Sequence, residues 1–335
     1  MREALLDRLR CPKCQAERSF RLEAAERDER EIREGELHCD GCGLHRHVRR
    51  GIVDLLLDPP DFVSREAAGL GRFAEVMDEG GWDRDRILGL PDKEESGYWY
   101  VQTVSMNALV DRMDFQPGET LLDVGSNTCW ASNRFAELGM DVVALDITTT
   151  EMQGLETADY WLEARDTYFE RLLSTMFGPA LASNSMDYVF CCEVLHHNDR
   201  AHLDRTMAEL FRVLKPGGRL LVINEPLRFL TDLKRDHATE VAQFEGNEHV
   251  YFAFQYMRAA RRAGFAISVE EPMYVQFFRG YNLRARSLKG LARRSLPALA
   301  RRIRPARRAY LHGRNLMGRD VAFNMIGTKP SADGA

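Results

Sequence analysis

Residues 120–147 hold the feature that most constrains this chain: an apolar strand, a tight loop and a helix, followed by a second apolar strand. Each strand carries an acid at its carboxyl end, Asp123 in TLLDVG and Asp146 in DVVALD. Open α/β sheets bind ligands at the carboxyl ends of their parallel strands, where an acid can accept the hydroxyls of a ribose. The pattern therefore predicts an α/β fold that binds a nucleoside-containing cofactor.

The loop after the first strand contains one glycine, Gly125, which is followed by Ser126, Asn127, Thr128 and Cys129. A dinucleotide fold uses G-x-G-x-x-G so that its backbone can approach a pyrophosphate. Because the second and third glycines are absent here, the loop disfavours NAD and FAD. It favours a cofactor that contains adenosine but no phosphate, and S-adenosylmethionine (SAM) meets that description.

Two C-x-x-C pairs near the amino end predict a metal site: Cys11 with Cys14, and Cys39 with Cys42. The pairs are separated by 24 residues, a spacing with which four thiolates can close a tetrahedral Zn²⁺ site. Four cysteine ligands leave no open position, so we expect the zinc to be structural and to take no part in catalysis. A segment this short buries little core, so the metal would supply its folding energy.

Three histidines, His38, His45 and His47, crowd the second cysteine pair. We interpret them as side chains that lie in solvent or behind the cysteine ligands, and not as ligands that replace a cysteine. A redox function for the cysteines is disfavoured, because no thioredoxin-like βαβ pattern surrounds them.

Composition and charge narrow the class of protein. The chain has 335 residues, a formal net charge of −5 and no apolar run long enough to span a bilayer. Its first residues lack the apolar core of a secretory signal, so we expect a cytoplasmic protein. Eleven Lys and Arg but no acid lie between residues 284 and 314, so the rest of the chain is strongly acidic. This balance disfavours general nucleic-acid binding and leaves 284–314 as the region that could meet phosphates or an anionic membrane.

The alternation of apolar strands and helices continues beyond residue 147. A third strand is expected near 169–176, where its pattern is poorly defined. The other strands are predicted at 186–191 and 219–224, with a final antiparallel pair at 265–270 and 321–328.

Three segments carry a family resemblance: Asp123-Val-Gly, the run DYVFCCEVLHHN that starts at Asp187, and Leu214-Lys-Pro-Gly-Gly before a strand. Together they resemble class I SAM-dependent methyltransferases of the type 11 kind. The ending Arg50-Gly-Ile-Val-Asp-Leu-Leu of the cysteine segment resembles zinc-ribbon modules of the Trm112-like kind. The resemblance implies an α/β, Rossmann-like methyltransferase sheet of seven strands, with SAM as cofactor, preceded by a small zinc ribbon.

The same resemblance divides the chain into three parts. Residues 1–57 form the zinc-ribbon module, residues 58–116 the linker and lid helices, and residues 117–330 the SAM-dependent methyltransferase domain. A basic helical insertion is expected at about 278–318.

The resemblance also implies roles for individual residues. Cofactor contacts come from the loop and the strand ends: Asp123, Gly125, Ser126, Asn127, Asp146, Ile147, Glu193 and Leu195. An enzyme that methylates a hydroxyl benefits from a base that takes the proton of the acceptor. The candidates for this base are His196, His197, Glu225 and His249.

Three functions stay open at this point. The first is O-methylation of a small-molecule acceptor such as a sugar, a glycolipid or a secondary metabolite. The second is methylation of a guanine in RNA, because bacterial ribosomal-RNA guanine methyltransferases also carry a zinc module before this fold. The third is a non-catalytic scaffold, which the missing glycines motivate. The basic segment 284–314 also permits peripheral membrane contact. The sequence predicts no oligomeric state.

Overall fold

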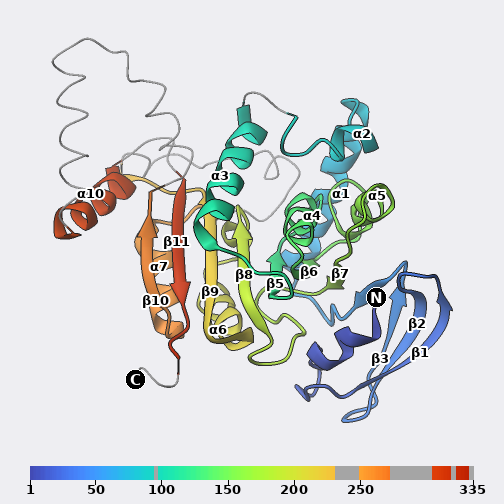
Figure 1. Ribbon diagram of the computed structural model, residues 1–335. Coiled ribbons are helices and arrows are strands. Elements are labelled where there is room, and N and C mark those ends of the chain that lie inside the picture. The colour runs from blue at the N-terminus through green and yellow to red at the C-terminus, as the bar shows by residue number, and fades with distance from the viewer. Residues whose placement is uncertain (94–96, 231–248, 272–303, 318–321, 332–335) are drawn as a thin grey trace.

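The computed structural model describes residues 1–93, 97–230, 249–271, 304–317 and 322–331 (Figure 1). The strands form one sheet, in the order β1 (Phe20–Arg27), β2 (Ile32–Cys39), β3 (His45–Arg49), β4 (Ile52–Asp54), β7 (Glu170–Leu173), β6 (Asp141–Asp146), β5 (Thr120–Val124), β8 (Met186–Cys192), β9 (Leu214–Glu225), β11 (Phe323–Thr328) and β10 (Ala266–Glu270). Within the described ranges, no helix combines the length and the apolar character that a bilayer crossing needs.

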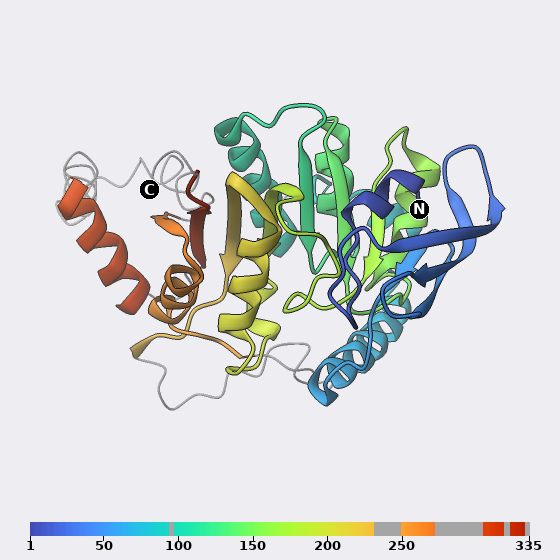
Figure 2. The same ribbon diagram turned by 90° about the horizontal axis from the view of Figure 1, so that it is seen from below.

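Helices lie on both faces of the central strands (Figure 2). The α-helices are α1 (Asp61–Glu79), α2 (Arg84–Ile87), α3 (Gly97–Met113), α4 (Trp130–Glu137), α5 (Ala158–Ala164), α6 (Leu203–Val213), α7 (Ala253–Ala263) and α10 (Arg304–Met317). The described residues also form three short 3₁₀ helices: η1 (Glu3–Arg8), η2 (Leu155–Thr157) and η3 (Leu195–His197).

The predicted seven-stranded Rossmann-like sheet is confirmed in strands β5 to β11. Strands β7, β6, β5, β8 and β9 are parallel neighbours, and β11 pairs antiparallel with both β9 and β10. The Lys-Pro-Gly-Gly turn lies inside the first part of β9, where it shifts the register between β8 and β9. Most of the predicted basic insertion, 278–303, lies outside the described residues, and 304–317 forms α10.

The core has two layers because side chains alternate across each strand. Leu122 of β5 packs in the layer that includes residues of α6 and α7, whereas Leu121 packs in the layer that includes residues of α3 and α4. Helices α6 and α7 lie against each other on one face of the sheet, and α3 and α4 lie on the opposite face (Figure 2). Strands that are covered on both faces read as continuous apolar runs, which is why the sequence reveals them.

The cysteine-rich module continues the same sheet. Its strand β4 pairs in parallel with β7, with Val53 opposite Leu172. Leu5, Leu9 and Leu37 of the module are buried in the same core cluster as residues of α6. The prediction that this segment buries little core is therefore wrong. Its apolar side chains share the core of the larger domain, because β4 covers the edge that β7 would otherwise expose.

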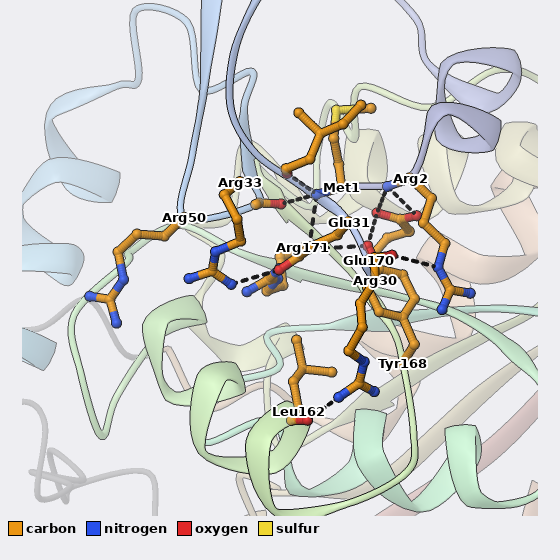
Figure 3. A network of polar contacts seen from close by, with 12 residues as sticks. Met1, Arg2, Arg30, Glu31, Arg33, Arg50, Leu162, Tyr168, Glu170 and Arg171 are labelled. Carbon is orange, nitrogen blue, oxygen red and sulfur yellow. Dashed lines mark hydrogen bonds and ion pairs between the residues drawn. The ribbon is translucent and has the colours of Figure 1, made fainter. Parts of the chain in front are cut away.

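A buried ionic network joins the module to the domain (Figure 3). Arg171 of β7 is fully buried, and its guanidinium contacts the Glu31 carboxylate and lies 2.8 Å from Asp159 Oδ1. The Met1 amino group lies 2.9 Å from Glu31 Oε2. Burial alone would raise the pKa of Glu31, but the charges and hydrogen bonds of Arg171 and of the Met1 amino group together outweigh burial and lower that pKa to about 2. The two parts of the chain are thus joined by paired charge as well as by apolar packing.

Candidate active site and metal centre

A cavity of about 1040 Å³ opens at the carboxyl ends of β5, β6 and β8. One face of α1 forms part of its wall through Glu66, Leu70, Phe73 and Met77, which are three or four residues apart. Trp99 of α3 lines the same wall. Residues of the two helices α1 and α3 therefore form part of the cavity wall.

The loop after β5 adopts a glycine-like backbone without the expected glycines. Gly125, Asn127 and Cys129 have φ angles of +69°, +46° and +58°. Side chains cost energy in this left-handed region, and asparagine is among the residues that enter it most readily. The Asn127 amide N–H donates to Asp146 Oδ2 at 2.9 Å, and its side chain donates to Gln153 Oε1 at 2.7 Å. These bonds hold the loop open toward the cavity.

Every predicted cofactor residue except Leu195 lines this cavity: Asp123, Gly125, Ser126, Asn127, Asp146, Ile147 and Glu193. Leu195 is fully buried in the core instead, and its amide N–H donates to Glu225 Oε1. Its neighbour Val194 takes the expected place in the cavity wall.

Three carboxyl groups at the strand ends line the cavity: Asp123, Asp146 and Glu193. Burial raises the pKa of Asp123 to about 7 and the pKa of Asp146 to about 6. Burial likewise raises the pKa of Glu193 to about 7, although Glu193 accepts hydrogen bonds from Tyr98 Oη at 2.6 Å and Gln102 Nε2 at 2.9 Å. A cationic ligand would favour the ionised form of each group.

Glu225 does not act as a free base in this arrangement. Its Oε1 accepts the amide N–H groups of Val194 and Leu195, both at 2.8 Å, and its Oε2 lies 3.1 Å from His196 Nδ1. Burial lowers the pKa of His196, which keeps that imidazole neutral near pH 7. Glu225 and His196 therefore fix the turn after β8.

His197 forms a pair with an acid that the sequence did not indicate. Its Nδ1 lies 2.9 Å from Glu66 Oε1, and both residues line the cavity. The side chain of His197 keeps 19% of its surface exposed, whereas that of Glu66 keeps 4%. The Glu66 carboxylate therefore lies beside the ring as an ion-pair partner for a protonated imidazole. The helical spacing of Glu66 with Leu70 and Phe73 is the signal that could have found it.

His249 lies outside the cavity. Its side chain is exposed, and its amide N–H donates to the carbonyl of His196 at 2.7 Å. Its neighbours Asn247 and Glu248 lie outside the described residues.

Comparison with known proteins agrees with this geometry. Residues 122–222 match the family model described as a methyltransferase domain. The match runs from β5 into β9, so it contains the loop, Asp146 and His197. The chain contains a class I SAM-dependent methyltransferase domain.

Curated relatives match parts of this methyltransferase chain. The biotin biosynthesis bifunctional protein BioHC of Cellvibrio japonicus is 28% identical over 52% of this chain and 35% of that protein. Phosphoethanolamine N-methyltransferase 2 of Caenorhabditis elegans is 27% identical over 32% of this chain and 24% of that protein. Demethylmenaquinone methyltransferase of Renibacterium salmoninarum is 30% identical over 34% of this chain and 44% of that protein. The chain thus spans less than half the length of each.

Solved structures resemble the chain more broadly and at lower identity. A Haemonchus contortus phosphoethanolamine N-methyltransferase 2 in complex with S-adenosyl-L-methionine has a TM-score of 0.45 and 19% identity, over 77% of this chain and 60% of that chain. A geranyl diphosphate methyltransferase has a TM-score of 0.42 and 16% identity, over 69% and 78%.

The methyltransferase domain should lose SAM affinity when Gly125 is replaced by alanine. A Cβ there would lie 2.3 Å from Val194 Cγ2, at a φ of +69°. Overlap and backbone strain together cost about 3 kcal/mol, which is roughly a hundredfold in Kd. Gly118→Ala is the matched control, because Gly118 has a φ of +82° but no heavy atom within 4 Å of its Cβ position. Titration calorimetry should show weakened binding for the first variant alone, and equal affinities would contradict this.

The raised pKa values predict a pH dependence. Asp123 and Asp146 start from 3.8, and their folded pKa values are about 7 and about 6. The folded chain therefore binds these protons more tightly than the unfolded chain, and the resulting stability is lost as pH rises through the folded values. A cationic cofactor gains as the acids ionise, so SAM affinity should rise from about pH 5 to about pH 8. Calorimetry across this window checks the sign, and a constant Kd would contradict it.

The four cysteines of the methyltransferase's amino-terminal module lie as zinc ligands do. All four sulfurs are within 4.8 Å of one another, and Cys11 to Cys42 and Cys14 to Cys39 are both 3.7 Å. Zn–S bonds of about 2.3 Å in a tetrahedron place neighbouring sulfurs about 3.8 Å apart, whereas disulfide sulfurs are about 2.05 Å apart. The residues fit Zn²⁺, which would cross-link the two knuckles.

Metal analysis tests this fit. The purified chain should hold about one zinc after dialysis, because a closed tetrathiolate site exchanges its metal poorly. Cys14→Ser should abolish that zinc, since it removes one of four ligands. Cys129→Ser is the matched control, because Cys129 is buried in the domain and is not one of the four clustered cysteines. Equal zinc content in both variants would contradict the assignment.

Proposed function

We propose that the chain is a SAM-dependent methyltransferase that methylates an oxygen of a small molecule. The observation that carries the proposal is that one cavity holds both the cofactor-type strand ends and the His197–Glu66 pair. The strand ends suit an adenosine cofactor, and the His197–Glu66 pair supplies a base in the same cavity.

Each polar group of the cavity has a defined task in this proposal. Asp146 accepts the ribose hydroxyls, in addition to the backbone N–H groups that it already holds. The loop at Gly125 lets the methionine end approach the backbone, and Asp123 orients its amino group. Glu193 balances positive charge near the end of β8. When bound, SAM supplies a methyl group on a good leaving group, so alignment provides much of the rate.

His197 takes the proton of the acceptor. When the acceptor oxygen forms its bond to the methyl carbon and the methyl–sulfur bond breaks, the hydroxyl hydrogen would pass to the imidazole of His197. Glu66 stabilises the imidazolium that results and holds the ring in one orientation. The proton then leaves to solvent, to which the side chain of His197 is partly open.

The cavity wall favours a small acceptor with apolar or aromatic surface. Trp82, Trp99 and Phe229 line it together with Leu70 and Phe73. Such walls bind apolar rings and chains, whereas RNA binding depends on cationic contacts to phosphates. The names of the relatives support small acceptors, since phosphoethanolamine and demethylmenaquinone are small molecules. The basic residues 284–303, which motivate the RNA alternative, lie outside the described residues.

Cofactor binding and methyl transfer test the proposal in two steps. Titration calorimetry with SAM and S-adenosylhomocysteine should give saturable one-site binding, and no heat at saturating concentrations would support the scaffold alternative. Transfer from isotopically labelled SAM to a panel of hydroxylated and amine acceptors then tests the chemistry. Label on oxygen acceptors supports the proposal, whereas label found only on amines or on RNA would contradict it.

A further inference from the structure

A carboxylate and two imidazoles converge on one face of the β2–β3 hairpin. Glu36, His45 and His47 each offer a ligand atom, and these atoms all lie within 4.8 Å of one another. The register pairs Glu36 with His47 and His38 with His45. Alternate residues of neighbouring strands share a face, so the strand pairing itself gathers these side chains. No residue of this hairpin lines the cavity at the strand ends.

The spacing of these groups is close to that of metal ligands. His45 Nε2 lies 3.0 Å from Glu36 Oε2. Nitrogen and oxygen ligands bound at about 2.0–2.1 Å in a tetrahedron are about 3.3 Å apart. Glu36 and His45 are also about half exposed, so an ion could reach them without any movement of the backbone.

The neighbouring His38 gives a second, independent indication. Its Nε2 is buried and makes no hydrogen bond to the described part of the chain. It lies 3.7 Å from the same Glu36 Oε2, which is too long for a hydrogen bond. The His38 ring also stacks on His45, with centroids 4.5 Å apart. Buried polar atoms are rarely left without a partner, and a cation or its bound water beside Glu36 would give this nitrogen one.

We propose that Glu36, His45 and His47 form a second metal site, separate from the four-cysteine centre, that takes a divalent transition metal such as Zn²⁺. Imidazole with carboxylate is a donor set that suits zinc, copper, nickel or iron, and it does not suit magnesium or calcium. Three protein ligands leave a position for water, so this metal exchanges with solution, whereas the cysteine-bound metal is enclosed. His38 holds the His45 ring in place. This proposal goes beyond the sequence interpretation, which placed these histidines in solvent or behind the cysteine ligands.

Zinc stoichiometry tests the proposal on the full chain, purified without a histidine tag and with its cysteine site loaded. Calorimetric titration with Zn²⁺ should show about one further equivalent for the wild-type chain, and His45→Ala/His47→Ala should abolish it. His312→Ala, on α10, is the matched control and should bind as wild type does. Retention of the first zinc in every variant shows that the module is still folded.

Two results would overturn the proposal: no further zinc bound by the wild-type chain, or equal binding by the double variant. If the double variant loses the cysteine-bound zinc as well, the single changes Glu36→Gln and His47→Ala replace it. Each should weaken the second site by about tenfold or more while the first zinc stays. Magnesium in place of zinc should give no heat, and a magnesium signal of equal size would contradict the predicted donor chemistry.

Discussion

His197→Gln should lower kcat by about a hundredfold to ten-thousandfold, the range that a positioned general base contributes. Glutamine keeps a polar side chain of similar reach but cannot take the proton of the acceptor. The Kd for SAM should change much less than kcat, because glutamine removes the base but leaves in place Asp123 and Asp146, which would hold the cofactor. Steady-state kinetics together with calorimetry separate the two quantities.

Glu66→Gln should also lower kcat, but by less than His197→Gln does. The imidazole remains in place, but the carboxylate 2.9 Å from Nδ1 no longer stabilises its positive charge. His249→Ala distinguishes this pair from the other candidate base, and it should keep its kcat because its ring is exposed outside the cavity. A full kcat in His197→Gln, or a large loss in His249→Ala, would contradict the assignment of the base.

Arg171→Met should destabilise the chain by about 3 kcal/mol, at the lower end of the cost of breaking a buried ion pair. Methionine keeps much of the side-chain volume, but Glu31 and Asp159 stay buried after the cation is removed. The loss is at the lower end because Arg33 still reaches both acids, at 2.6 Å and 3.3 Å. Urea unfolding of the zinc-loaded chain measures the difference in free energy of unfolding.

The pH dependence of unfolding gives this prediction a specific signature. Arg171 and the Met1 amino group together lower the folded pKa of Glu31 from 4.5 to about 2. The stability that this shift contributes is complete above pH 4.5 and is lost as pH falls toward 2. Arg171→Met should therefore flatten the acid limb of the stability curve. Arg8→Ala is the matched control, because its exposed pair with Asp141 also joins the module to the domain and is worth less than about 1 kcal/mol. Equal losses in the two variants would contradict a special role for the buried pair.

The strand β7 shows where sequence patterns reach their limit. The strands β5, β6 and β8 are mostly apolar, and their bounds agree with the prediction to within one residue. Strand β7 reads as ambiguous because it carries Glu170 and Arg171, both of which are buried. Partners from the amino-terminal module stabilise these buried charges in the strand. A local sequence pattern cannot indicate such partners, because they lie far away along the chain.

The candidate site divides in the same way. Sequence position predicts that Asp123, Asp146 and Glu193 follow strands at one edge of the sheet, because parallel strands align their carboxyl ends. It also places His196, His197 and Glu225 close together. It does not indicate which of these three candidate bases takes the proton. That choice depends on hydrogen bonds that occupy Glu225 and on Glu66, which reaches His197 from a helix before the sheet.

The backbone of the loop after β5 adopts glycine-like angles although the loop lacks the second and third glycines. The sequence has Asn127 and Cys129 in a loop where a glycine-rich motif would have glycine, and this left a non-catalytic scaffold open as an alternative. The structure shows that both residues adopt positive φ, so the loop keeps its shape. Asn127 is held there by its bonds to Asp146 and Gln153. A residue type alone indicates how costly a conformation is, and the surrounding contacts decide whether the chain adopts it.

The sequence by itself determined the α/β class, the positions of the central strands along the chain, the loop after the first of them and the four cysteines that cluster in the amino-terminal module. These features depend on periodicity, on turn chemistry and on ligand spacing, which act over short stretches of chain. The tertiary structure alone decided that β4 extends the sheet, that Arg171 joins the two parts, and that His197 is paired with Glu66. Each of these is a contact between distant segments, and its energy comes from burial and from paired charge that exist only once the chain is packed.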